Sequence, residues 1–478
     1  MKKFIYILSY CCALLFYSCS NFTDLQPKGK NLLTTVDQLD MLFNMEFDNS
    51  GLNSDIDEYF IGDAYPRLTN IPNLINQASP SLTQILFTWN ESLDRSQYTP
   101  SDSKYTIYYS IIGKIANPVL SKIDEASGDA TKAKQLKAEA LVLRAYFEYL
   151  LVNHYAKAYN PKTATDDGGV PYPLDTDPIA EPCKKYTVKE VYEMINKDLD
   201  DAIALNSLPD ENVNQMRVSK AFTYAVRAKV YMSMQAYDKA YEAAQQSLAI
   251  NNTIVDYNTM LTDGVSSETN IPYKMFSRPY MNCKEDLFFT YDQKLFSAFT
   301  PEYNAMFEDG NVVYNCYPCD TRLYSKMIGL MFYGLDIDCW MSSDNTFFSD
   351  SGLTTVDMYL TEAEIDIRND KIDDAMEILD NIRINRLFPS NYKPLKKVIT
   401  TKSSAIEKFK QISRTENVWT VKNFINIKRW NTEKNEWTEV ETKTVLGKEY
   451  TLASDSPLWI WAFPTNATSV NSNLTQNY

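Results

Sequence analysis

Glycine is scarce in this chain, and the scarcity limits which folds the chain can adopt. The 478 residues include only 13 glycines, whereas an average share of about 7 % would give roughly 33. Glycine supplies the positive backbone φ angles that tight hairpin turns and phosphate-binding loops need. The sequence therefore disfavours an all-β barrel or sandwich. It also lacks G-x-G-x-x-G and G-x-x-x-x-G-K-[ST], the motifs of Rossmann and P-loop nucleotide sites.

Charge and histidine content exclude several classes of function. A formal net charge of −15 is the opposite of the basic footprint that nucleic-acid-binding proteins carry. His154 is the only histidine, which excludes H-E-x-x-H zinc hydrolases and multi-histidine metal sites. No carboxylate pair is marked out as glycosidase catalysts, and no D-x-[DN]-x-[DN]-G calcium loop is present. We therefore predict no catalytic residue, no metal site and no cofactor, with a glycoside hydrolase as the enzymatic alternative.

The first nineteen residues resemble the export signal of a bacterial lipoprotein. Two lysines precede Phe4 to Phe16, an almost entirely apolar run that is too short to span a bilayer and fits the core of a signal peptide. Ser18 then stands directly before Cys19, as a small residue does in the lipobox. We expect cleavage before Cys19 and lipidation of Cys19, so that residues 1–18 are the signal peptide. A plain signal peptide, or an anchor with a coincidental cysteine, is the alternative.

Several segments repeat apolar residues with the 3.6-residue period of a helix. The longest covers residues 131–155, and the next begins with the capping box Thr187-Val-Lys-Glu190. Two later helix pairs resemble each other. The pairs are residues 219–234 with 237–250, and residues 354–368 with 372–386.

Both pairs carry small residues where their two helices would meet. One constant shift along the sequence aligns Ala228 with Ala363 and Ala240 with Ala375. Small residues let two helices approach closely, as they do in tetratricopeptide hairpins. The sequence therefore predicts repeat-like helical hairpins that are dispersed along the chain.

Two irregular segments, at about residues 50–105 and 251–350, are rich in Tyr, Phe, Asn, Asp and Ser. Their aromatic content argues against disorder, and long ordered loops are usually functional. We predict a mainly α fold in which a tetratricopeptide-like scaffold carries a loop-rich second part. All of it forms a single unit, residues 19–478, with the scaffold at about 19–250 and 351–478 and a ligand-facing insertion at about 251–350.

Six stretches, in order along the chain, resemble the SusD/RagB-like outer-membrane lipoproteins of glycan-utilisation systems. Each stretch is short, but together they extend over nearly the whole chain. They are Cys19 to Pro27, Tyr108 to Ile123, Ala138 to Phe147, the hairpins around Ala228 and Ala363, Ile412 to Glu416 with Ile427 to Trp430, and Phe463 to Asn477.

This resemblance implies a binding function without catalysis. It implies a SusD-like fold and a lipid anchor in the outer membrane, with the protein facing the cell exterior. The implied ligand is an oligosaccharide, and the implied partner is a SusC-type TonB-dependent transporter that receives it. A peptide-binding, RagB-like protein of the same architecture is the alternative.

A glycan site needs flat aromatic faces together with amide, carboxylate or guanidinium groups that pair with hydroxyls. The two irregular segments hold such residues close together, although any of these rings could instead form the core of its loop. The ligand-binding candidates are Asp57, Tyr59, Tyr65, Trp89, Asn90, Tyr273, Arg278, Tyr280 and Trp340.

Other conspicuous residues have structural interpretations. His154 continues the apolar stripe of its helix, which predicts a core histidine. Glu139 and Arg144 lie in the middle of the same helix, where ion pairing or solvation is expected. The cysteines beyond Cys19 form a structural disulfide or unpaired thiols, because the C-x-x-C pair among them lacks a thioredoxin-like context. These cysteines are Cys183, Cys283, Cys316, Cys319 and Cys339.

Overall fold

The computed structural model describes the chain from residue 33 with several gaps. The described ranges are 33–44, 55–174, 182–212, 214–265, 272–279, 281–292, 296–315, 326–341 and 348–478. Cys19, Tyr280, Cys316 and Cys319 lie outside them.

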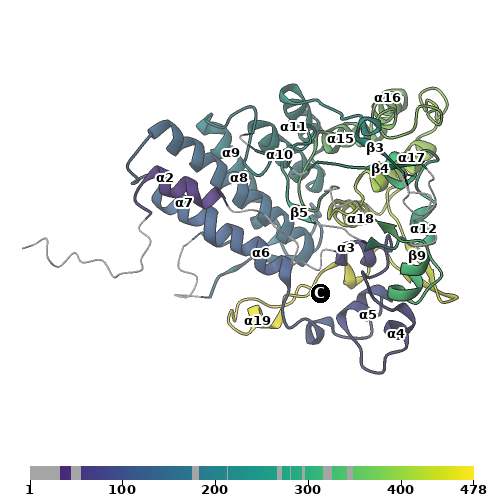
Figure 1. The fold of residues 1–478 in the computed structure, drawn as a ribbon. Coiled ribbons are helices and arrows are strands. Elements are labelled where there is room, and N and C mark those ends of the chain that lie inside the picture. Colours follow the sequence, from purple (N-terminus) through teal and green to yellow (C-terminus); the bar gives the residue numbers. More distant parts are fainter. Residues whose placement is uncertain are drawn as a thin grey trace, which may run out of the picture.

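Long helices form the scaffold, and each packs against the next along the chain (Figure 1). Contacts join α8 to α9, α9 to α10, α10 to α11, α11 to α15, and α15 to α16. This stack of helical pairs confirms the predicted mainly α, tetratricopeptide-like fold. The helices are α8 (Ala130–Tyr155), α9 (Val188–Leu205), α10 (Lys220–Ser233), α11 (Tyr237–Ile250), α15 (Thr355–Arg368) and α16 (Ile372–Arg383).

The helix ends follow local signals in the sequence. Thr187 caps α9 with a complete capping box, in which its side chain accepts from the Glu190 amide and the Glu190 side chain accepts from the Thr187 amide. Ser219 and Thr354 cap α10 and α15 in the same position. The predicted helix bounds therefore agree with the structure to within a few residues.

The small residues of the two hairpins are completely buried. Ala228 and Ala240 in α10 and α11 have no exposed surface, and neither do Ala363 and Ala375 in α15 and α16. Because nothing larger than a methyl group stands at these positions, the paired helices can pack closely, as expected from the sequence.

Shorter helices precede and follow the scaffold. In Figure 1, α2 and α7 lie beside α8 at one end of the molecule, whereas α17 and α12 lie at the other. The early ones are α2 (Val36–Asp40), η1 (Met41–Asn44), α3 (Ile56–Phe60), α4 (Ile71–Asn76), α5 (Leu82–Phe87), η2 (Arg95–Tyr98), α6 (Ser103–Ile111), the π-helix η3 (Ile112–Ala116) and α7 (Asn117–Lys122). The later ones are η4 (Tyr257–Met260), α12 (Pro301–Asn304), α13 (Val312–Asn315), the π-helix η5 (Gly329–Tyr333), α17 (Lys402–Glu416), α18 (Lys422–Glu433), η6 (Pro457–Trp459) and α19 (Thr465–Thr468).

The strands form only short antiparallel pairs within the described residues. The longest are the hairpins β3 (Leu261–Val265) with β4 (Pro272–Phe276) and β9 (Glu441–Val445) with β10 (Lys448–Leu452). The others are β1 (Gly168–Pro171) with β2 (Lys185–Thr187), β5 (Tyr291–Asp292) with β8 (Phe348–Ser349), and β6 (Phe296–Ser297) with β7 (Trp340–Met341).

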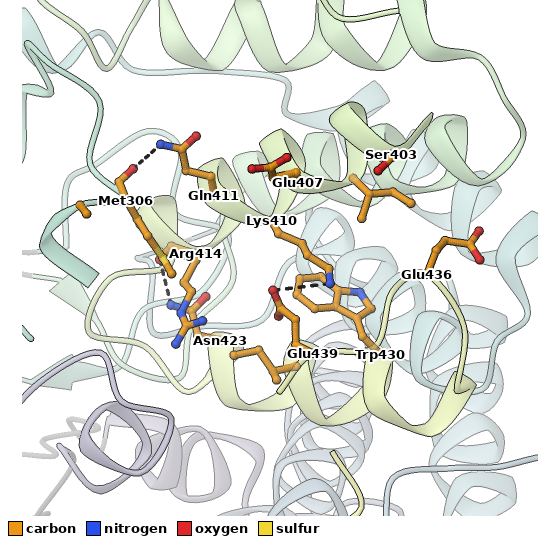
Figure 2. A pocket seen from close by; sticks show the side chains of 13 residues that line it. Met306, Ser403, Glu407, Lys410, Gln411, Arg414, Asn423, Trp430, Glu436 and Glu439 are labelled. Carbon is orange, nitrogen blue, oxygen red and sulfur yellow. Dashed lines mark hydrogen bonds and ion pairs between the residues drawn. The ribbon is translucent and has the colours of Figure 1, made fainter. Parts of the chain in front are cut away.

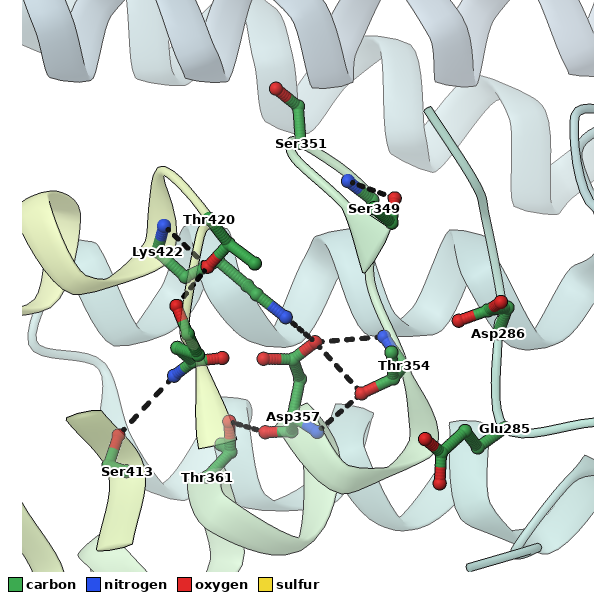
Figure 3. A network of polar contacts seen from close by, with 12 residues as sticks. Glu285, Asp286, Ser349, Ser351, Thr354, Asp357, Thr361, Ser413, Thr420 and Lys422 are labelled. Atoms are coloured by element: carbon green, nitrogen blue, oxygen red, sulfur yellow. Dashed lines mark hydrogen bonds and ion pairs between the residues drawn. The ribbon is translucent and has the colours of Figure 1, made fainter. Parts of the chain in front are cut away.

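Buried charges connect α15 to α18. The Lys422 ammonium donates to Asp357 at 2.8 Å, and the Thr354 amide donates to the same carboxylate oxygen (Figure 3). Two helical turns further along both helices, Arg429 donates to both oxygens of Glu364 at 2.8 and 2.6 Å. The equal spacing of the two ion pairs fixes the register of α18 against α15.

The polar residues of α8 are also structural. His154 has no exposed surface, and its ring stacks on Phe424 with centroids 5.3 Å apart, which confirms the predicted core histidine. Arg144 forms a bidentate ion pair with Asp198 at 2.7 and 2.8 Å. Glu139 accepts from Arg217 at 2.7 Å.

Of the cysteines, Cys283 is buried, and burial raises the pKa of its thiol to about 12.

Candidate functional site

The structure buries the three aromatic candidates that precede α6, which corrects the expectation that they contact a ligand. Tyr59, Tyr65 and Trp89 are between 3 % and 6 % exposed. The Trp89 indole donates to the Phe60 carbonyl at 2.6 Å, and the Lys443 ammonium lies 4.0 Å from the centre of the Trp89 ring. Trp89 thus anchors the β9–β10 hairpin to the core through a cation–π contact.

Asp57 and Arg278 are buried as well, and both are used in ion pairs. Asp57 accepts from Lys104 and lies 3.2 Å from His154 Nε2. Burial acts to raise the pKa of Asp57, but Lys104 and His154 outweigh it and lower that pKa. Arg278 donates to Asp286 at 2.6 Å. These two side chains therefore hold the interior together, and the prediction that they bind a ligand is corrected.

The remaining candidates stay predictions. Asn90 is partly exposed, and its side-chain oxygen accepts from the amide and hydroxyl of Ser92. Tyr273 lies in β4 and Trp340 in β7. Tyr280 falls outside the described residues.

A cleft of about 540 Å³ opens between α17, α18 and the segment that leads into β9 (Figure 2). We call it the α17/α18 cleft. Its size is within the range of small-molecule sites. The lining residues are Ala305, Met306, Ser403, Ile406, Glu407, Lys410, Gln411, Arg414, Asn423, Ile427, Trp430, Glu436 and Glu439.

Helical periodicity explains how the two walls arise. Along α17, Glu407, Lys410 and Arg414 recur at intervals of three and four residues and so share one face. Along α18, Asn423, Ile427 and Trp430 do the same. The two helices are joined by the short connection around Trp419, so these faces meet across a single gap.

Lys410 stands at the centre of the cleft. Its ammonium donates to the Trp437 carbonyl at 2.8 Å and lies 3.5 Å from Glu439 (Figure 2). It also lies 5.4 Å from the centre of the Trp430 ring. Burial lowers the pKa of Lys410, and burial together with the neighbouring Glu441 raises the pKa of Glu439. The two groups are thus partly desolvated but remain close to the open cleft.

Fixed side chains support the base of the cleft. The Trp430 indole donates to Glu364 at 3.2 Å. Arg414 donates to Asp63 at 2.7 Å and to Glu441 at 2.8 Å. Burial raises the pKa of Asp63 to about 7 although Arg414 opposes this effect. Since these groups are already oriented by partners, a ligand would meet a preformed wall.

The cleft offers both hydrogen-bond acceptors and donors. Exposed carboxylates from Glu407 and Glu436 offer acceptors at its rim, and Lys410 and Gln411 contribute donors. Across the part of the chain that is described, no group of three His, Cys, Asp or Glu side chains could hold a metal ion.

Only a weak signal in the sequence pointed to this site. The stretches Ile412 to Glu416 and Ile427 to Trp430, which carried the family resemblance, lie in α17 and α18. The polar stripe of α17 could have been recognised from its spacing, but nothing local indicated that α18 and residues 436–439 complete the cleft.

None of the helices in the described residues combines the length and apolar character that a membrane span requires.

Residues 55–232 match the SusD-like family model described as "Starch-binding associating with outer membrane". No curated protein matches the chain.

Solved structures match over almost the full length. A SusD superfamily protein from Bacteroides thetaiotaomicron has a TM-score of 0.67 at 14 % identity, covering 93 % of this chain and 100 % of that one. A putative sugar binding protein from Bacteroides vulgatus has a TM-score of 0.66 at 14 % identity, with 94 % and 99 % covered. A SusD-like carbohydrate binding protein from Bacteroides vulgatus has a TM-score of 0.61 at 17 % identity, with 93 % and 98 % covered. The chain therefore shares its fold with SusD superfamily structures, and its residues 55–232 are similar to the SusD-like family model.

Proposed function

We propose that this protein captures oligosaccharides at the outer surface of the cell and passes them to a SusC-type TonB-dependent transporter. The observation that carries the proposal is the match of residues 55–232 to a family described as starch-binding and associated with the outer membrane. The lipobox-like Cys19 supports attachment to that membrane. The protein binds its ligand and does not transform it.

We propose the α17/α18 cleft as the place where the oligosaccharide binds. Sugars present hydroxyls that need paired donors and acceptors, together with apolar C–H faces. The cleft combines the carboxylates of Glu407 and Glu436 with the ammonium of Lys410. Ile406 and Trp430 are almost fully buried and form its apolar base. Because Lys410 and Trp430 are already held in place, little ordering is needed on binding.

Calorimetric titration of the purified mature chain tests the function. The ligands are a fixed panel of neutral hexasaccharides with malto-, cello-, xylo-, manno- and galacto-type backbones. We expect at least one member to bind. Absence of binding to the whole panel, with binding to short peptides instead, would favour the peptide-binding alternative.

A pair of double variants tests the cleft. Glu407→Ala with Glu436→Ala removes two exposed acceptors, and loss of hydrogen bonds to charged groups is expected to weaken binding at least about tenfold. Glu125→Ala with Glu449→Ala is the matched control, because it removes two exposed carboxylates that do not line the cleft. Equal affinities for both double variants would show that the ligand binds elsewhere.

A further inference from the structure

A second cleft of about 500 Å³ lies on another face of α18. We call it the C-terminal cleft, since residues 454–460 and 477–478 form much of it together with residues 157–167 and the end of α18. The α18 residues that line it are Lys428, Asn431 and Thr432, whereas Asn423, Ile427 and Trp430 line the α17/α18 cleft. One helix thus separates two cavities of similar size.

The C-terminal cleft holds the most exposed aromatic residue among those whose side chains the structure describes. Tyr478 is 39 % exposed, and it is the only described aromatic side chain with more than about a third of its surface open to solvent. Every other ring whose side chain the structure describes is buried or half-buried. A sugar that stacks on an aromatic face needs a ring of this kind.

The Tyr478 ring is held rigidly. The Arg95 guanidinium lies 3.5 Å from the ring centre and donates to the carbonyls of Pro457 and Ile460 at 2.7 and 3.1 Å. The Tyr478 hydroxyl donates to Asp94 at 2.9 Å. Because Arg95 is itself buried, one face of the ring is fixed against the protein and the ring loses little entropy when a ligand covers its remaining exposed surface.

Polar groups without partners accompany the ring. Within the described residues, the Asp455 carboxylate, the Ser454 hydroxyl and the Lys434 ammonium make no hydrogen bond or ion pair. The Asn431 amide nitrogen, on a side chain that is 4 % exposed, also lacks a partner. The lining therefore offers both an acceptor and donors that the fold itself does not use.

The other lysines that line the cleft already have partners. Lys157 pairs with Asp167 at 2.6 Å. The Lys428 ammonium donates to the carbonyls of Asn153 and Ala156, at the C-terminal end of α8, at 2.6 and 2.7 Å. The free acceptor Asp455 and the free donor Lys434 carry opposite charges, so the lining favours an uncharged ligand.

We infer that the C-terminal cleft is a second carbohydrate-binding site, which takes a neutral sugar unit on the exposed surface of Tyr478 and pairs its hydroxyls with Asp455 and Lys434. The ligand class rests on the proposed function, but the site is separate from the α17/α18 cleft. A chain with two sites, one on each side of α18, can hold two segments of one glycan and gain affinity through that linkage.

Titration of the wild-type chain and of Tyr478→Ala with the same hexasaccharide panel tests the inference. We expect two sugars bound per wild-type chain and one per Tyr478→Ala chain, with the affinity of the lost site reduced at least about tenfold. Asp455→Asn, which preserves the shape of the side chain, should weaken the same site. Tyr450→Ala is the matched control, because Tyr450 is a half-buried ring with Lys448 4.7 Å from its centre and lines neither cleft.

The outcomes separate this inference from the proposed function. Binding that is unchanged in both Tyr478→Ala and Asp455→Asn would overturn the second site and leave the proposed function intact. A single site abolished by Tyr478→Ala would support the C-terminal cleft and overturn the assignment of the α17/α18 cleft. No binding to any member of the panel would contradict both.

Discussion

Replacing Glu364 with glutamine is expected to destabilise the protein through loss of one buried charge. Glu364 is 3 % exposed and accepts hydrogen bonds from Arg429, Arg368 and the Trp430 indole. Glutamine keeps the shape of the side chain but cannot balance the two guanidinium groups. Breaking a buried ion pair on one side leaves the partner charges uncompensated.

The size of the effect follows from the pKa of Glu364. Burial acts to raise this pKa, but Arg429 and Arg368 outweigh it and lower the pKa from an ordinary 4.5 to about 2. One pKa unit corresponds to about 1.4 kcal/mol, so the ionised carboxylate contributes about 3 kcal/mol to the free energy of unfolding. Because the folded-state pKa is the lower one, this contribution is present above about pH 4.5 and is lost as the pH falls toward 2.

Urea unfolding followed by circular dichroism measures the change, and Glu362→Gln is the matched control. Glu362 lies two residues before Glu364 on the same helix, but burial and the nearby Asp366 raise the pKa of Glu362 to about 7. A raised carboxyl pKa gives stability that is lost as the pH rises through 7, so at mildly alkaline pH Glu362→Gln should be neutral or stabilising. Glu364→Gln should be destabilising under the same conditions.

The refuting result is therefore specific. Equal effects of Glu364→Gln and Glu362→Gln at mildly alkaline pH would contradict the assignment of opposite pKa shifts. A destabilisation by Glu364→Gln that persists unchanged below the folded-state pKa of Glu364 would also contradict it, because the wild-type glutamate and the glutamine of the variant are then both neutral.

Three further expectations concern the interior. Lys229→Met should stabilise the protein by at most about 3 kcal/mol below about pH 8 and by progressively less toward pH 10. The reason is that burial lowers the pKa of Lys229 from 10.5 to about 8, so the folded state disfavours the charged side chain. Thermal melts across this pH range measure the effect, and a stabilisation that grows with pH would contradict it. Ala228→Leu should cost about 1–3 kcal/mol in urea unfolding, since Ala228 has no exposed surface, and a stability equal to wild type would show that the hairpin has room at this position. Trp89→Phe should cost about 1 kcal/mol through loss of the bond to the Phe60 carbonyl while leaving calorimetric oligosaccharide binding unchanged; weaker binding with unchanged stability would restore Trp89 as a ligand contact.

Local signals were sufficient to predict much of the scaffold. Apolar periodicity and N-terminal capping residues lie within a few positions of the helices they specify, as for Thr187 and α9. The burial of His154 followed from its place in an apolar stripe for the same reason. These features depend on short-range geometry that the sequence displays directly.

The site depended on contacts between distant parts of the chain. Trp89 is a core residue because Lys443, on a hairpin far along the sequence, covers its ring. Nothing near Trp89 distinguishes this arrangement from an exposed binding platform. Similarly, Tyr478 is a fixed ring because Arg95, far away in the sequence, lies against it. Residue type therefore identified candidate chemistry, whereas the assignment of rings to core or surface required the tertiary structure.

The most direct test of ligand capture is a crystal structure of the mature chain soaked with the panel member that binds most tightly. We expect sugar density in the α17/α18 cleft, with hydroxyls within hydrogen-bonding distance of Glu407, Glu436 or Lys410. Well-defined sugar density on another surface, with this cleft empty, would contradict the account.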